Sequence, residues 1–185
     1  MSEYSKSVDR RQFLGRVSAG AVGASIGASL VRNAGAAADD AGDPEKRNYQ
    51  TSMTYRRLGK TNLLVSRLSF GCLPLSDESI PVLEMLVERG VNLVHVSEAY
   101  GRGRAMASLG KYLAVAGNRD KVWVALKADR GIDAATVDRQ LGILNTDHVD
   151  IICSPISNPD QIRNAEGERE AYEKLKQAGK VRYYN

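Results

Sequence analysis

Short apolar runs and segments of helical periodicity alternate from residue 68 to the last residue, and this order limits the fold more than any other feature. The apolar runs predict strands at 68–71, 91–96, 121–127 and 149–154, and from 182 onward. The periodic segments predict a helix from a cap at Ser76 or Asp77 to Gly90, and further helices at 104–115, from 133, and at 158–179 with a break near Gly167. Strands that alternate with helices through short loops form parallel sheets with right-handed crossovers. Both an open doubly wound sheet and a barrel fit this order.

Two shorter signals sit at the borders of this region. Residues 53–66 predict a hairpin, with its turn at Gly59-Lys60-Thr61-Asn62. The segment Gly101-Arg102-Gly103-Arg104 contains a lone Gly-x-Gly, which is weak evidence for a phosphate site outside a dinucleotide-binding context. We expect this segment to open the second helix instead.

The first 38 residues differ in composition from the rest of the chain. Arg10 and Arg11 precede an uncharged run at 17–31, and Ala34-Gly35-Ala36-Ala37-Ala38 offers small residues for a signal peptidase. This pattern predicts a twin-arginine signal peptide at 1–38, read by the twin-arginine export machinery, and an exported, periplasmic or extracytoplasmic protein. An uncleaved membrane anchor is the alternative, although spanning needs about 20 residues. We expect a polar linker at 39–52 and a folded domain at 53–185.

Charge and cysteine content exclude other classes of function. Five of the 26 basic residues and two of the 22 acidic residues lie in 1–38, so the remainder is almost neutral. It carries no basic stripe with interleaved aromatic residues, and we expect no nucleic-acid partner. Cys72 and Cys153 end two separate predicted strands and are interpreted as buried thiols rather than a disulfide. No Cys/His spacing indicates a metal site.

Polar side chains follow two neighbouring predicted strands. Tyr100 comes just after the strand that ends near His95, and Lys127 ends the strand that begins near Trp123. Alternation along a strand places Lys127 on the same face as Trp123, and His95 faces the same centre. An ammonium beside a phenol stabilises the phenolate, so that the phenol can donate a proton to a developing alkoxide.

Several stretches of the chain, taken in order along the sequence, resemble the aldo-keto reductase family. The stretches that carry the resemblance cover essentially all of 53–185 and include Tyr55-Arg-Arg-Leu-Gly-Lys-Thr-Asn-Leu-Leu-Val-Ser, Gly90-Val-Asn-Leu-Val-His-Val-Ser-Glu-Ala-Tyr-Gly, Leu109-Gly-Lys-Tyr-Leu, Leu144-Asn-Thr-Asp-His-Val-Asp and Glu173-Lys-Leu-Lys-Gln-Ala-Gly-Lys-Val-Arg-Tyr. The resemblance implies an α/β fold, a partial TIM (β/α)8 barrel made of an N-terminal hairpin and about four and a half βα units.

The resemblance also implies a chemistry. Tyr100 would be the general acid and Lys127 the residue that tunes it, in the reduction of an aldehyde or ketone by NADP(H) or NAD(H). His95 aligns with the family's aspartate that pairs with the lysine, and Pro155 aligns with its strand-four histidine. Glu98 is a candidate substitute carboxylate, with a solvated loop residue as the alternative. The groups that bind the dinucleotide are expected beyond Asn185.

Two functions remain open on the sequence. The first is an exported aldo-keto reductase acting on a small carbonyl substrate. The second is a non-catalytic or truncated relative, acting as a binding module or as the first half of a split barrel. About four and a half units leave two parallel edges open, which predicts self-association or a second-half partner.

Overall fold

The computed structural model describes residues 42–129, 131–155 and 159–185. The predicted signal peptide at 1–38 lies outside the described residues. Within the described part, no helix combines the length and apolar character that crossing a bilayer requires.

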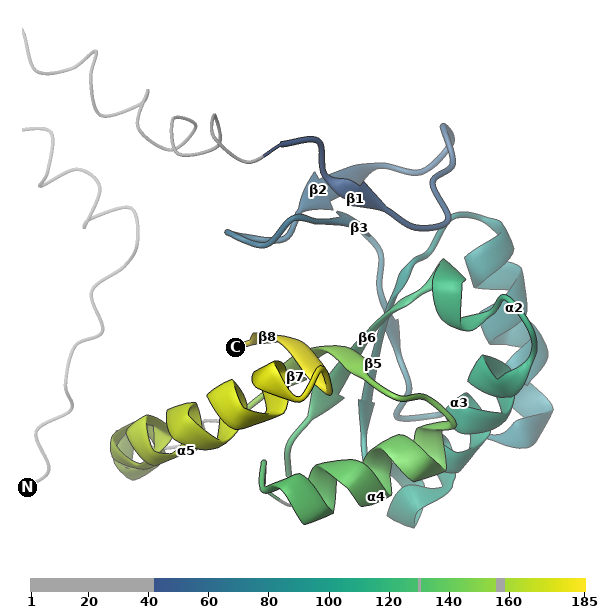
Figure 1. The fold of residues 1–185 in the computed structure, drawn as a ribbon. Coiled ribbons are helices and arrows are strands. Elements are labelled where there is room, and N and C mark those ends of the chain that lie inside the picture. The colour runs from purple at the N-terminus through teal and green to yellow at the C-terminus, as the bar shows by residue number, and fades with distance from the viewer. Residues whose placement is uncertain (1–41, 130, 156–158) are drawn as a thin grey trace, which may run out of the picture. The chain divides into compact units, whose positions relative to one another are not determined.

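A parallel five-stranded sheet forms the centre of the domain (Figure 1). Its strands are β4 (Phe70–Gly71), β5 (Leu93–Ser97), β6 (Trp123–Lys127), β7 (Val149–Cys153) and β8 (Val181–Tyr184). They lie side by side in chain order, and each neighbouring pair is parallel. A doubly wound sheet reverses its strand order at a switch point, whereas a barrel keeps sequential order. The sheet is therefore part of an α/β barrel, as predicted.

The connecting helices cover the outer face of this sheet (Figure 1). They are α2 (Ile80–Glu88), α3 (Arg104–Ala114), α4 (Ala134–Leu144) and α5 (Pro159–Gln177). Val94, Val124 and Ile152 point from the strands into the main apolar core beneath the helices. Alternate residues of the same strands, such as Trp123 and Ile151, form a second core on the inner face. This alternation follows from the two-residue repeat of a strand.

Local sequence signals account for the helix boundaries. Asp133 is the N-cap of α4, and its side chain accepts a hydrogen bond from the Thr136 N–H at 3.0 Å. A Cβ atom at Gly110 would collide with the Ile143 carbonyl oxygen, so glycine is what allows α3 to lie this close to α4. The predicted break near Gly167 is wrong, because α5 continues through it. One interior glycine costs only about 1 kcal/mol, which a 19-residue helix can absorb.

A small sheet covers the N-terminal ends of the inner strands. It consists of β1 (Glu45–Lys46), β2 (Tyr55–Arg57) and β3 (Leu63–Ser66), in the order β1-β3-β2. Strands β2 and β3 form the predicted hairpin. Leu63 and Val65 pack against Trp123, and the indole N–H of Trp123 donates to the Leu64 carbonyl at 3.2 Å. The hairpin therefore closes this end of the sheet.

The predicted polar linker at 39–52 contains folded structure. Strand β1 pairs in parallel with β3, and Arg47 Nη1 donates to the Val122 carbonyl at 2.9 Å. The amides of Asn48 and Gln50 donate to the carbonyls of Val87 and Glu88, which end α2. The side chains of this segment are polar because they bind backbone carbonyls. Contacts of this kind produce no periodic pattern of apolar residues, so the sequence alone does not reveal them.

Candidate active site

Three of the residues singled out by sequence lie together at the carboxyl ends of β5 and β6. The Lys127 Nζ atom lies 5.9 Å from the centroid of the Tyr100 ring. The rings of His95 and Tyr100 have their centroids 6.0 Å apart, with a 59° angle between their planes. The structure therefore brings a phenol, an imidazole and an ammonium to one rim of the sheet.

A tight turn fixes Tyr100 beside β5. Tyr100 begins a 3-10 segment, Tyr100–Gly103, in which Gly101, Arg102 and Gly103 have φ angles of 58°, 57° and 88°. Left-handed angles of this kind favour glycine, which explains the Gly-x-Gly at this point. Gly103 is also the N-cap of α3, so the segment opens the second helix as predicted. The turn spans four residues and leads directly into α3.

Lys127 has a carboxylate partner that the sequence analysis did not identify. Its Nζ atom lies 2.8 Å from Asp129 Oδ1, and the Ser97 hydroxyl donates to Asp129 Oδ2. The hydrogen bond and the charge of Asp129 raise the pKa of Lys127 above its ordinary value. No local signal identifies this residue, because Asp129 lies beyond the apolar run of β6 and the chain turns there, with the Asp129 N–H donating to the Lys127 carbonyl.

His95 is half-buried at the same rim. Burial lowers its pKa below the ordinary value of 6.5, the charge of Lys127 lowers it further, and Asp129 opposes both. The imidazole is therefore neutral at pH 7. It can share a hydrogen bond with a neighbour, but it adds no positive charge beside Lys127.

Two other residues from the sequence analysis lie apart from this group. Glu98 forms an ion pair with Arg139 at 2.8 Å and accepts a hydrogen bond from Gln140 at 3.1 Å, so its carboxylate binds α4. Of the two alternatives for Glu98, the structure does not support the substitute carboxylate, since the carboxylate that pairs with Lys127 is Asp129. Pro155 follows the end of β7 and has no ionisable group.

A hollow lies on the inner face of the sheet, and its lining reaches the hairpin turn at 58–61 but does not include Tyr100, Lys127 or His95. Its volume is about 500 Å³, and its lining includes Ala125, Ile151, Cys153 and Tyr183. Cys153 lies opposite Lys127 in the β6–β7 register. Cys153 is partly buried and Cys72 fully buried, and both thiols are free. The described residues include no group of three His, Cys, Asp or Glu side chains placed to hold a metal ion.

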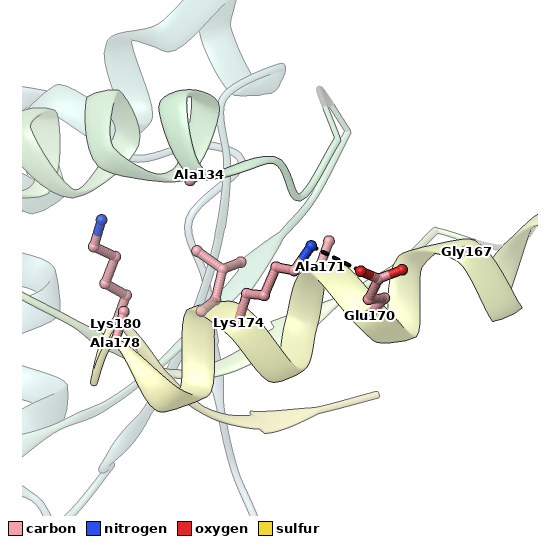
Figure 2. Close-up of a pocket in the computed structure, with 8 residues that line it drawn as sticks. Ala134, Gly167, Glu170, Ala171, Lys174, Ala178 and Lys180 are labelled. Atoms are coloured by element: carbon pink, nitrogen blue, oxygen red, sulfur yellow. Dashed lines mark ion pairs between the residues drawn. The ribbon is translucent and has the colours of Figure 1, made fainter.

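A smaller hollow of about 260 Å³ lies between α4 and α5 (Figure 2). Ala134, Ala171 and Lys180 are among its lining residues, and Lys174 forms an ion pair with Glu170 at 2.8 Å along its edge. None of its lining residues belongs to the Tyr100–Lys127 rim. It is a surface groove between two helices, and the Lys174–Glu170 pair is exposed to solvent.

Comparisons with known proteins point to one family. A model of the aldo/keto reductase family matches residues 74–185. The uncharacterised oxidoreductase YqkF of Bacillus subtilis (strain 168) is 28% identical over 150 residues, which cover 71% of this chain and 48% of YqkF. The L-galactose dehydrogenase of Arabidopsis thaliana is 31% identical over 152 residues, covering 72% of this chain and 48% of that enzyme.

Solved structures agree with this match. The holo form of the aldo-keto reductase AKR11C1 from Bacillus halodurans aligns with a TM-score of 0.58 and 29% identity, covering 71% of this chain and 49% of that one. The chain thus spans about half the length of the relatives that it matches.

Proposed function

The chain belongs to the aldo/keto reductase family, a family of oxidoreductases, and we propose that it serves the NAD(P)H-dependent reduction of an aldehyde or ketone, with Tyr100 as general acid. One observation carries this proposal: Tyr100 lies beside the ammonium of Lys127 at the carboxyl ends of parallel strands. In (β/α)8 enzymes this rim holds the active site.

Each residue of the rim has a defined part in this proposal. The Tyr100 hydroxyl donates its proton to the carbonyl oxygen of the substrate as negative charge develops there. Lys127 stabilises the phenolate that remains, because its charge lies close to the ring. His95 is neutral and can orient the carbonyl through a hydrogen bond.

The cofactor belongs to the proposal as well. A bound nicotinamide would supply the hydride. The inner hollow lies on the sheet face that carries Lys127, and its lining includes Ala125, Cys153 and Tyr183, which supports it as the place of the nicotinamide ring. Within the described ranges, no residue is assigned to the dinucleotide phosphates.

A titration and one variant test the assignment of Tyr100. We expect NADPH to bind the protein, observed as a change in nicotinamide fluorescence. Tyr100→Phe should retain this binding and lose turnover by roughly 100- to 10,000-fold, since general acid catalysis contributes on that scale. Tyr49→Phe is the matched control, because Tyr49 is an exposed tyrosine packed against Tyr55. Full turnover in Tyr100→Phe would refute the assignment.

A second candidate function is a non-catalytic binding module or the first half of a split barrel. Pro155 favours it, because a proline stands where the resemblance implies a histidine. Self-association or a second-half partner would then cover the inner hollow. Failure to bind NADPH at millimolar concentration would favour this candidate over the reductase.

We also propose that the protein is exported by the twin-arginine machinery. The support is the sequence of residues 1–38, with Arg10-Arg11, the uncharged run and the small residues that follow. Replacing both arginines by lysine should keep the protein in the cytoplasm on cell fractionation. Recovery of the exported protein in the membrane fraction would indicate the anchored alternative.

A further inference from the structure

We infer that Asp129 is a positioning residue for Lys127. It supplies, from the end of β6, the carboxylate that the resemblance implies at the position of His95 on β5. This inference rests on the proposed function, since it concerns the lysine that assists Tyr100. It assigns a role to a residue outside the family positions at Tyr100, Lys127, His95 and Pro155.

The position of Asp129 depends on backbone contacts at the end of β6. The Ala128 N–H donates to the Cys153 carbonyl at 2.8 Å, which ties the chain to β7 just past Lys127. The Asp129 N–H then donates to the Lys127 carbonyl at 3.0 Å, so the chain turns back at once. These two bonds place the Asp129 carboxylate over the lysine that precedes it.

Ser97 fixes the carboxylate from the neighbouring strand. It is fully buried and is the register partner of Lys127 in the β5–β6 pair. Its hydroxyl donates to Asp129 and accepts a hydrogen bond from the Ala99 N–H at 3.0 Å. One hydroxyl therefore joins the partner of Lys127 to the turn that presents Tyr100.

Asp129 provides the negative charge that faces the Lys127 ammonium. The groups that face the ammonium are Asp129, Tyr100 from the 3-10 turn and His95 from β5, with Cys153 opposite in register on β7. Among the described residues, Asp129 is the one carboxylate within ion-pair distance of Lys127. Its side chain is only 16% exposed, against 33% for Lys127, so the pair is partly shielded from water.

The test measures the lysine directly, whether or not the protein turns over substrate. The pKa of Lys127 is obtained by NMR of ¹³C-lysine-labelled protein, with the signal assigned through Lys127→Arg. Asp129→Asn should lower this pKa, and Asp129→Glu should retain most of the elevation. Asp138→Asn is the matched control, since it removes a carboxylate from an exposed ion pair with Lys180. An unchanged Lys127 pKa in Asp129→Asn would overturn the inference.

Turnover supplies the second readout. In Asp129→Asn we expect kcat to fall on the order of 10- to 100-fold, as for a catalytic group displaced by about 1 Å, with NADPH affinity unchanged. The alkaline limb of the kcat profile should move to lower pH, because the lysine loses its proton earlier. Asp129→Glu, which keeps a carboxylate at this position, should recover part of the rate. An unmoved alkaline limb would also overturn the inference, whereas absence of turnover in the unmodified protein would refute only the proposed function.

Discussion

Two carboxylates bind cations at opposite ends of the same sheet. At the closed end, which we define as Asp150 with Arg47, Arg119 and Arg182, the carboxylate is completely buried. Its oxygens lie 3.5, 2.8 and 3.4 Å from the three guanidinium groups. The Val124 N–H donates to it as well, at 2.8 Å.

The open end, which we define as Tyr100, Lys127, Asp129, Ser97 and His95, is organised differently. A single ion pair joins Lys127 to Asp129, and the lysine side chain remains one-third exposed. An ammonium has three hydrogen-bond donors, so this pair leaves donors available to another group. The closed end uses its charges to join strands and hairpin, whereas the open end keeps charge accessible. This division matches the roles of the two rims in (β/α)8 barrels.

The largest expected effect lies at the closed end. Asp150→Asn keeps the shape of the side chain but removes the negative charge between three arginines. Loss of one partner from a buried ion pair costs about 3–5 kcal/mol, and we expect that decrease in the free energy of unfolding. Urea denaturation measures it, with Asp138→Asn as the exposed control. A loss below about 1 kcal/mol would show that the closed end is not a structural ion network.

A smaller loss of stability is expected from replacing Ser97, the buried residue of the open end. Ser97→Ala removes a donor to Asp129 and leaves the Ala99 N–H without its partner. Ala99 is exposed and Asp129 is partly exposed, so water can replace part of the lost contact, and the variant should lose about 0.5–1.5 kcal/mol of stability in urea, the net contribution of an ordinary hydrogen bond. It should also slow turnover, because Asp129 and the Tyr100 turn lose their common contact.

Ser108→Ala is the matched control for this variant. Ser108 is also buried, and its hydroxyl donates to Asp77 Oδ1 at 2.7 Å on the outer side of the domain. We expect it to lose stability while turnover stays unchanged. Equal turnover losses in the two serine variants would remove the distinction between the open end and the rest of the domain.

The sequence predicts the two ends unequally well. Tyr100 and Lys127 are identifiable because they follow apolar runs, and strand parity places Lys127 on the same face as Trp123. Asp129 escapes the prediction because it lies past the apolar run, where polar residues are read as loop. Its role depends on a turn held by β7 and on a hydroxyl from β5, and neither contact leaves a local pattern.

The closed end escapes the prediction for a related reason. Arg47 lies in a segment whose composition is typical of a linker, yet its guanidinium carbon lies 3.9 Å from the centroid of the Trp123 ring. Glu45 and Arg182 form an ion pair although they are 137 positions apart. Hydrophobic periodicity places strands and helices, but contacts between charged groups so distant in sequence depend on the finished fold.

The smallest expected effect tests the charge of the open end through pH. Burial and Lys127 lower the pKa of His95 in the folded state, so between that pKa and 6.5 the unfolded chain binds more protons. Stability should therefore fall as the pH decreases below about 6.5, and level off below the folded pKa. Because His95 is only half-buried, we expect the free energy of unfolding to change by less than about 1 kcal/mol between pH 7.5 and 5.5, relative to His95→Gln.

The comparison requires urea denaturation at both pH values and should be repeated in a His148→Gln background, which removes the histidine outside the open end. Equal pH dependence with and without His95 would mean that Lys127 does not act on the imidazole, and that the open end is more hydrated than its contacts indicate.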